Sequence, residues 1–374
     1  MKLEEKTMEE LKKICITKKL KGYSRLNKKD LVLFLQNNKG KKIGGMVNEN
    51  GNGNENGKGK GNGKVPLINF IPPPTLPIAD IGNNIGNLSE LSIPKIGFGT
   101  YIGVDEEKIK NKRSSNNRLG AVYTSVLIAL NTGYRILDLA ENYNNLEPIK
   151  QAIITSGISR KELFIIMKTN DPSISNIYRL LTETFDKDKD KYFDLVLWHH
   201  FDPNNIIKWN YFSAIKTEKL SRYIGISNCY QKGLKKLITY CSQNGMHYPD
   251  ANEFEINLWN QQKDLVKLCK TYNILPIAYS PLGYKNYPMI LANNNIQNIA
   301  TKTQLPIPQI LLKFLMDQGI LVIPSSEKED HILENFNSTN IKLNKANVAI
   351  LNNKNTVLFA TWTAENSKRK NNYL

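Results

Sequence analysis

From about residue 91 onward, two patterns of apolar and polar residues alternate along the chain. Short runs rich in Ile, Val, Leu and Phe are followed by longer stretches with apolar residues every three or four positions. The first pattern predicts buried strands and the second predicts amphipathic helices. Eight strands are expected, at Lys95–Thr100, Arg135–Leu139, Leu163–Lys168, Phe193–His199, Arg222–Ser227, Asp250–Ile256, Ile274–Ser280 and Ile320–Ser325.

Helices are expected between these strands. They span Leu119–Asn131, Leu146–Ser156, Ile174–Phe185, Ile206–Lys216, Gln231–Gln243, Gln261–Tyr272 and Pro308–Gln318. Strand-then-helix units repeated over roughly 260 residues are typical of the (β/α)8 TIM barrel, an α/β fold. A doubly wound sheet is the alternative, but the first expected turn, Gly97-Phe-Gly-Thr-Tyr101, lacks the G-x-G-x-x-G spacing which that fold would favour.

Two further regions are expected before the barrel, which is assigned to residues 91–374. Residues 1–36 show helical spacing of apolar positions on both sides of Gly22 and predict a small all-α module. Residues 37–90 are rich in Gly, Asn and Lys and then in Pro, which predicts a flexible linker. The first region is similar to helical modules of the SAP and Rho amino-terminal type, many of which bind nucleic acid.

The positive charge is concentrated at the amino-terminal end. The chain carries a formal charge of +17, and residues 1–64 contain sixteen basic and seven acidic residues. A basic appendage of this kind predicts a nucleic acid or an acidic protein as partner. The alternative is that this region is a helical tether whose basic face is solvated and binds no partner.

Other features of the composition indicate a cytoplasmic protein. The first residues are charged and lack the apolar segment of a secretory signal, and no apolar run approaches a membrane span of ~18 residues. The four cysteines have no C-x-x-C spacing, so free thiols are expected.

Four chemically active side chains are expected at the carboxyl ends of successive barrel strands, where barrel enzymes place their active sites. They are Asp138, Tyr143, Lys168 and His199. Reduction of a carbonyl needs a proton donor, and a tyrosine becomes a useful one near neutral pH when a cation lies beside it. Lys168 is the candidate cation and Asp138 its counter-ion, while His199 is expected to orient the substrate oxygen.

Each of these residues alone has an ordinary structural explanation. An aspartate can cap a helix, a tyrosine can pack and a lysine can be solvated. A metal site at His199 and His200 is not expected, because neighbouring residues on a strand point to opposite faces. The functional interpretation depends on the expectation that three consecutive strands place these four side chains in the same layer of the barrel.

Several motifs resemble those of the aldo-keto reductase family over residues 91–345. They are Ile93-Pro-Lys-Ile-Gly-Phe-Gly-Thr-Tyr101, Gly133-Tyr-Arg-Ile-Leu-Asp-Leu-Ala-Glu-Asn-Tyr143, Asp194-Leu-Val-Leu-Trp-His199, Ile224-Gly-Ile-Ser-Asn228, Ala278-Tyr-Ser-Pro-Leu-Gly283 and Ile323-Pro-Ser-Ser326. The resemblance implies reduction of an aldehyde or ketone with NADP or NAD, and no metal.

The resemblance also implies roles for individual residues. Asp138, Tyr143, Lys168 and His199 would form the catalytic tetrad, and Tyr101 and His200 would border the substrate. The implied cofactor-binding residues are Thr100, Asp138, Ser227, Asn228, Glu253, Tyr279, Ser280, Leu282, Ser325, Ser326, His331, Glu334 and Asn335. Among them, Ser227 and Asn228 would hold the carboxamide and Tyr279 would stack on the nicotinamide.

Three positions depart from the family pattern. Glu253 stands where the family usually has glutamine, and a carboxylate cannot donate a hydrogen bond as an amide does. Ser325 and His331 replace the lysine and arginine that commonly pair with the 2′-phosphate of NADP, so a weakened NADP preference is expected, unless Lys328 substitutes. The alternative to an enzyme is therefore a catalytically weak or inactive nicotinamide-binding scaffold.

The tail after residue 357 offers Phe359 and Trp362 near the substrate opening. Packing across the barrel rim is the interpretation favoured for both.

Overall fold

The computed structural model describes residues 7, 10, 11, 88, 93–102, 112–185, 192–356 and 359. The chain forms two compact units, Met1–Asn69 and Phe70–Leu374. The predicted helical module, linker and Trp362 lie outside the described residues, apart from the few isolated positions.

In the first unit, Thr7 begins a helical turn. Its backbone N–H donates to Glu10 Oε2 at 2.7 Å, and the N–H of Glu10 donates to Thr7 Oγ1 at 3.3 Å. This reciprocal pair is a capping box, which satisfies two N–H groups at a helix start. A helix that includes Leu11 is consistent with the predicted apolar spacing.

Eight parallel strands in the order β1 to β8 form the sheet of the second unit. Their bounds are β1 Phe98–Gly99, β2 Ile136–Ala140, β3 Phe164–Thr169, β4 Phe193–Trp198, β5 Ser221–Ser227, β6 Ala251–Glu255, β7 Leu275–Tyr279 and β8 Leu321–Ile323. The sheet closes on itself: the N–H of Gly97 donates to the oxygen of Val322, and the N–H of Val322 donates to the oxygen of Lys95, both at 2.9 Å. The predicted TIM barrel is confirmed.

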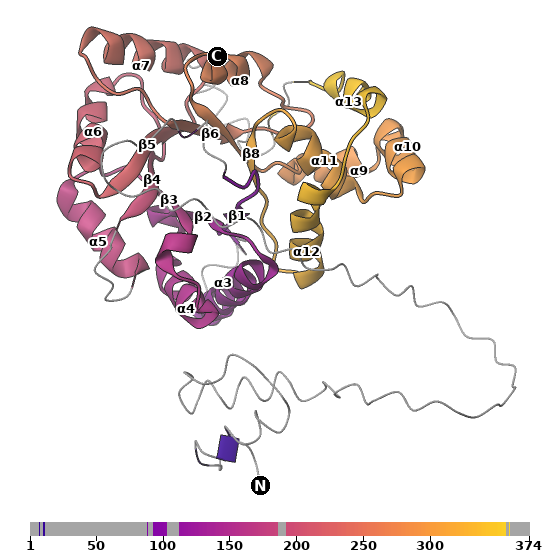
Figure 1. Cartoon of the computed structure of the whole chain (residues 1–374), viewed down its shortest axis with the longest axis horizontal. Helices are drawn as coiled ribbons and strands as arrows, with labels where there is room; N and C mark the ends of the chain where they lie inside the picture. The colour runs from indigo at the N-terminus through magenta and orange to yellow at the C-terminus, as the bar shows by residue number, and fades with distance from the viewer. Residues whose placement is uncertain are drawn as a thin grey trace, which may run out of the picture. The chain divides into compact units, whose positions relative to one another are not determined.

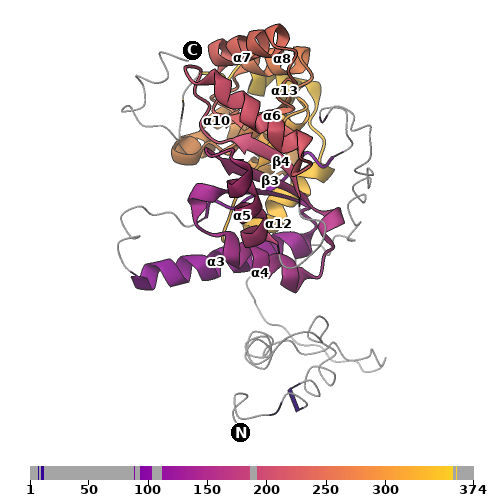
Figure 2. The same ribbon diagram turned by 90° about the vertical axis from the view of Figure 1, so that its left-hand side faces the viewer.

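Helices surround the strands (Figure 1). They are α3 Lys112–Thr132, α4 Leu146–Ser156, α5 Ile174–Thr184, α6 Trp209–Thr217, α7 Gln231–Gln243, α8 Lys263–Thr271, α9 Tyr287–Leu291, α10 Asn294–Thr303, α11 Ile307–Met316, α12 Glu329–Asn337 and α13 Lys345–Asn352. In the view turned by 90°, α3 and α4 lie side by side along one edge (Figure 2). Four of these helices, α9, α10, α12 and α13, were not expected from the sequence.

Apolar side chains fill the barrel interior toward the amino-terminal parts of the strands. The inner cluster is fully or almost fully buried and comprises Leu88, Ile93, Ile136, Phe164, Ile166, Leu195, Leu197, Tyr223, Ala251, Leu275, Ile277, Leu321 and Ile323. A larger apolar cluster lies between the strands and the outer helices. The carboxyl ends of the strands are thereby left for polar side chains.

A buried carboxylate ties together the amino-terminal sides of three strands. Asp194 on β4 accepts hydrogen bonds from Arg160 Nη2 at 2.7 Å, from the N–H of Ile165 at 2.8 Å and from Arg222 Nη1 at 3.2 Å. Because hydrogen bonds to charged groups are stronger than neutral ones, this cluster holds β3, β4 and β5 in register.

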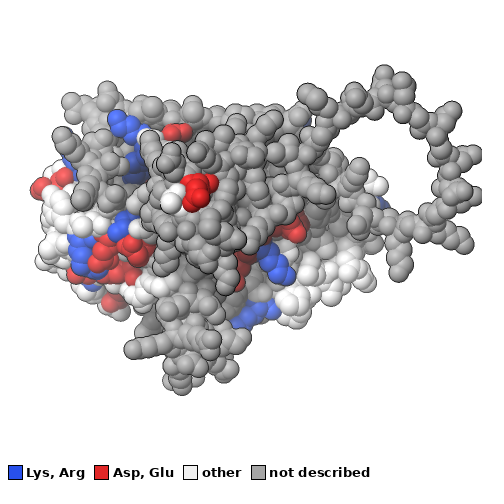
Figure 3. Space-filling model, turned by 90° about the horizontal axis from the view of Figure 1, so that it is seen from below, with Lys and Arg blue, Asp and Glu red and all other residues white. Residues whose placement is uncertain are grey.

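Described side chains of both signs of charge are present on one face of the molecule. On the face seen in Figure 3, the described Lys and Arg side chains lie beside Asp and Glu side chains. No single-sign patch of described residues is visible on that face. Within the described part of the chain, no helix is long and apolar enough to cross a membrane.

Candidate active site

A buried lysine lies at the centre of the polar layer. Lys168 on β3 is 1% exposed, and its Nζ lies 2.5 Å from both carboxylate oxygens of Asp138 on β2. The same Nζ donates to Glu253 Oε1 on β6 at 2.9 Å. Strands from different parts of the barrel wall thus direct one cation and two carboxyl groups to one point.

The second carboxyl group keeps a proton at higher pH than an ordinary glutamate. Burial, and then the charge of Asp138, raise the pKa of Glu253 to about 8. Burial also raises the pKa of Asp138, which the charge of Lys168 opposes. Burial by itself would lower the pKa of Lys168, but the charges of Asp138 and Glu253 raise it well above its ordinary value. Near neutral pH the cluster therefore contains an ammonium and a protonated Glu253.

Tyr143 lies on a short 3-10 helix, η3 (Glu141–Tyr143), that follows β2. Its ring centroid lies 5.3 Å from Lys168 Nζ, 5.9 Å from the ring of His199 and 4.8 Å from the ring of Tyr101. Burial raises the pKa of Tyr143 above its ordinary value, and the charge of Lys168 works in the opposite direction. The phenol is therefore protonated near neutral pH and faces a cation that can stabilise its conjugate base.

His199 follows β4 and is neutral. It is 8% exposed, and burial, with the charges of Lys168 and His200, lowers its pKa to about 2. Its Nδ1 is buried without a hydrogen-bond partner. A neutral imidazole of this kind can donate a hydrogen bond from one ring nitrogen without competing for the proton of Tyr143.

One prediction about the histidines was wrong. The rings of His199 and His200 stack with centroids 4.3 Å apart and planes 18° apart, instead of pointing to opposite faces. The reason is that β4 ends at Trp198, so the alternation of a strand does not extend to this pair. The backbone N–H of His200 donates to Asn170 Oδ1 at 2.9 Å. Among the described residues, no three His, Cys, Asp or Glu side chains are grouped as metal ligands.

The residues expected at the nicotinamide form a connected group beside His199. Asn228 has a left-handed backbone with φ of 59°, and its Nδ2 donates to the oxygen of His199 at 2.9 Å and to Ser227 Oγ at 3.1 Å. Its Oδ1 accepts a hydrogen bond from Tyr279 Oη at 2.8 Å. The hydroxyl of Thr100 is engaged with the oxygen of Asp138 at 2.7 Å.

The residues expected along the rest of the cofactor follow β7 and β8. Ser280 and Leu282 come directly after β7 and are partly buried. Ser325 and Ser326 follow β8, and the Ser326 hydroxyl accepts a hydrogen bond from the N–H of Lys328 at 3.1 Å. On α12, His331 is exposed, Glu334 is partly buried and Asn335 is 4% exposed. Within the described part of the chain, none of these residues forms a hydrogen bond or ion pair with the Lys168 cluster.

Phe359, expected near the substrate opening, packs edge-on against Tyr230 with ring centroids 5.6 Å apart.

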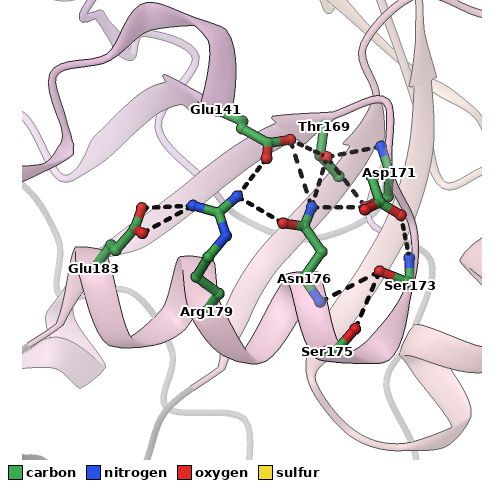
Figure 4. A network of polar contacts seen from close by, with 8 residues as sticks. All are labelled: Glu141, Thr169, Asp171, Ser173, Ser175, Asn176, Arg179 and Glu183. Carbon is green, nitrogen blue, oxygen red and sulfur yellow. Dashed lines mark hydrogen bonds and ion pairs between the residues drawn. The ribbon is translucent and has the colours of Figure 1, made fainter.

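Two functional contacts were missed by the sequence analysis. The first is the ion pair between Lys168 and Glu253, since Glu253 was assigned only to the cofactor. The second is a brace around Glu141, the residue that begins η3. Its carboxylate accepts a hydrogen bond from Thr169 Oγ1 at 2.5 Å and forms an ion pair with Arg179 on α5 (Figure 4). The alternation of side chains along β6, which directs Glu253 into the barrel, could have indicated its contact with Lys168. No spacing of residues in the sequence indicated the brace around Glu141.

Arg179 extends the brace along the outer helix. It forms a second ion pair with Glu183, at 2.8 Å, and donates to Asn176 Oδ1 at 2.6 Å (Figure 4). Thr169 directly follows Lys168, and Glu141 lies two residues before Tyr143. The brace therefore holds the segments that carry the phenol and the ammonium.

Comparison with known proteins agrees with this geometry. The aldo/keto reductase family model matches residues 95–356, and the model of the amino-terminal domain of Rho termination factor matches residues 2–43. A methylglyoxal reductase of Yersinia pestis is 32% identical over 70% of this chain and 92% of its own length. A 9,11-endoperoxide prostaglandin H2 reductase of Trypanosoma cruzi is 28% identical over 68% of this chain and 85% of its own.

Solved structures show the same similarity. An aldo-keto reductase from a deep-sea metagenome library matches with a TM-score of 0.62 and 28% identity, covering 72% of this chain and 94% of its own. The strand order, the polar layer at the carboxyl ends of the strands and the extent of the family match all lead to one conclusion: this chain is an oxidoreductase that belongs to the aldo/keto reductase family.

Proposed function

We propose that the barrel reduces an aldehyde or ketone to an alcohol with a nicotinamide dinucleotide, and that Tyr143 supplies the proton. The observation that carries this proposal is the position of the Tyr143 ring 5.3 Å from a fully buried ammonium. A cation at this distance stabilises the phenolate that remains after proton transfer. General acid catalysis by a positioned group contributes about 10²–10⁴ in rate.

The remaining members of the tetrad orient the reaction. Asp138 holds Lys168 through two contacts of 2.5 Å and keeps it charged. His199, as a neutral imidazole, donates a hydrogen bond to the carbonyl oxygen and directs that oxygen toward Tyr143. Tyr101 and His200 would border the substrate, since their rings contact Tyr143 and His199, respectively.

The polar groups beside His199 fit a nicotinamide carboxamide. Ser227, Asn228 and Tyr279 form one hydrogen-bonded group there and offer both donors and acceptors. The bound cofactor would supply the hydride. Ser280, Leu282, Ser325, Ser326, Glu334 and Asn335 would follow its pyrophosphate and adenosine portions.

We further propose that the preference for NADP over NAD is weak. Ser325, which follows β8, and His331 on α12 bring no permanent charge, and the exposed Lys328 between β8 and α12 is the cation of that segment. A single exposed lysine binds a phosphate less strongly than two charged groups with defined geometry.

Titration with NADPH and NADH, followed by tryptophan fluorescence, tests cofactor binding, and Tyr143→Phe tests the chemistry. The substitution should lower turnover of a model aldehyde at least about 100-fold, while cofactor affinity stays within about twofold. Tyr178→Phe is the matched control, because Tyr178 is exposed on the outer face of α5. Unchanged turnover in Tyr143→Phe would refute the mechanism, and failure to bind either cofactor would favour the scaffold alternative.

A second activity is proposed for the amino-terminal region. We propose that residues 1–36 form a helical module, that 37–90 form a linker and that residues 1–64 bind nucleic acid. The match of residues 2–43 to the Rho amino-terminal domain and the concentration of basic residues support this. The full chain should bind single-stranded RNA or DNA with an affinity that falls steeply with salt, and a chain beginning at residue 65 should not. Equal binding by both chains would refute the assignment.

A further inference from the structure

Glu253 brings a second carboxyl group to a site that has one cation. It is 2% exposed on β6, and only its Oε1 contacts Lys168. Its Oε2 is buried and accepts no hydrogen bond. Both oxygens of Asp138 already contact the same ammonium, so Glu253 has no counter-ion of its own.

Among the residues that the structure describes, the charges that act on the Glu253 carboxyl group are those of Asp138 and Lys168. The titratable groups around Glu253 are Asp138 on β2, Lys168 on β3 and Tyr143 on η3, with the neutral His199 after β4. The flanking strands β5 and β7 pair Ser227 and Ile277 with it, and neither side chain ionises in this range.

Protonation of Glu253 balances the charge of the cluster. With both carboxyl groups ionised, the buried cluster has a net charge of −1, and burial of an uncompensated charge is unfavourable. Both oxygens of Asp138 contact the ammonium, whereas only one oxygen of Glu253 does, so the proton is assigned to Glu253.

The position of Glu253 links this proton to the nicotinamide. A ring that delivers hydride to a carbonyl held by Tyr143 and His199 has to lie in contact with that carbonyl. Glu253 touches the ammonium next to Tyr143, and its backbone oxygen accepts a hydrogen bond from the N–H of Asn228 at 2.8 Å. Glu253 therefore joins the ammonium beside Tyr143, through its carboxyl group, to the segment proposed to hold the carboxamide, through its backbone.

We propose that Glu253 sets the redox form of nicotinamide that the protein prefers. With its proton, Glu253 donates a hydrogen bond to the cofactor in the way an amide would, and reduction is supported. Without its proton, Glu253 is an anion that favours the positively charged oxidised ring over the neutral reduced ring. This inference rests on the proposed function, because it requires the cofactor to bind at this site.

The charge of Glu253 acts on Tyr143 in the same direction. An ionised Glu253 raises the pKa of Tyr143, so the phenol becomes a weaker acid. A phenol that holds its proton more tightly is less suited to protonating a carbonyl and better suited, once ionised, to accepting the proton of an alcohol. Rising pH should consequently shift both cofactor choice and chemistry toward alcohol oxidation.

The test measures the dissociation constants of NADPH, NADP⁺, NADH and NAD⁺ by tryptophan fluorescence in wild type, Glu253→Gln and Glu255→Gln. From about pH 6 to about pH 10, affinity for the oxidised relative to the reduced form should rise on the order of tenfold in wild type. The ratio should stay within about twofold in Glu253→Gln, which cannot ionise. Glu255→Gln makes the same change two residues further along β6 and should retain the wild-type trend. The 2′-phosphate of NADP is present in both redox forms, so its titration cancels in the ratio.

A second readout needs no cofactor. The infrared carbonyl band of a protonated carboxyl group should be present in wild type at about pH 6, fade as the pH passes about 8 and be absent from Glu253→Gln. A pH-independent ratio in a wild-type protein that binds both forms would overturn the inference and leave the proposed function intact. Failure to bind any of the four dinucleotides would overturn both, even if the carboxyl band titrates as expected.

Discussion

The buried proton on Glu253 predicts how the stability of the barrel changes with pH. Its pKa in the folded protein is about 8, raised from an ordinary value of 4.5. Between these values the folded protein holds a proton that the unfolded chain has released. The unfolded state then binds fewer protons, so the free energy of unfolding falls as the pH rises through this window. The penalty is absent below about pH 4.5 and complete above about pH 8.

The size of the penalty follows from the same values. The gap is between three and four pKa units, and each unit corresponds to about 1.4 kcal/mol. The ion pair with Lys168 and the carboxyl groups of the cluster titrate together, so a loss of about 2–5 kcal/mol is expected for Glu253. Glu253→Gln keeps the size of the side chain and removes the ionisation, and should lack this loss.

Urea unfolding at about pH 5, 7 and 9 measures the effect without cofactor. Subtracting the curve of Glu253→Gln from that of wild type removes the titration of groups that the two proteins share, such as the buried cysteines. As the pH rises, wild type should lose about 2–5 kcal/mol of unfolding free energy relative to Glu253→Gln. The unfolding free energies of wild type, Glu253→Gln and Glu255→Gln could instead change with pH in parallel. That result would show that Glu253 is ionised throughout the pH range, and it would refute the reasoning.

Three further substitutions test the fold and the site. A Cβ at Gly225 would lie 2.5 Å from the oxygen of Ala251, so Gly225→Ala should lower the unfolding free energy by about 1–3 kcal/mol, whereas Gly120→Ala on an open helix face should not lower it. Asp194→Asn leaves two arginines without their buried counter-ion, and urea unfolding should show a loss of about 3 kcal/mol or more. Lys168→Met removes the cation beside the phenol, so aldehyde turnover should fall at least about 100-fold; turnover within tenfold of wild type would exclude Lys168 from the chemistry.

Local sequence patterns predicted the barrel because each strand and helix is encoded over a short window. The helices Leu146–Ser156 and Gln231–Gln243 were predicted with the bounds that the structure gives. The bounds of β2 to β8 were predicted to within two residues. Strand β1 begins three residues later than predicted, because Lys95 and Gly97 join the barrel only through single hydrogen bonds to Val322 of the last strand. The short α9 has a proline in its first turn and only five residues, too few for a periodic pattern to be recognised.

The sequence predicted the site residues that lie at the ends of neighbouring strands. It did not predict contacts between residues on opposite sides of the barrel. Asp138, Lys168 and His199 could be placed together because consecutive parallel strands end at one edge. The contact of Lys168 with Glu253 joins residues 85 positions apart and exists only because the sheet closes. The stacked histidines were predicted wrongly because the strand ends one residue earlier than expected. Two sets of predictions stay predictions. They are the catalytic and cofactor-binding roles of the site residues, and the boundaries of the helical module, the linker and the barrel.

The brace around Glu141 changes which parts of the surface can vary freely. Arg179 and Glu183 lie on the outer face of α5, where random substitution in a barrel is usually tolerated. Here they continue, through Glu141 and Thr169, to the backbone segments of the proton donor and its cation. A library that varies the solvent-facing positions of α5 to improve solubility would therefore also sample the alignment of the active centre, and variants selected for yield alone would lose turnover at this helix before they lose the fold.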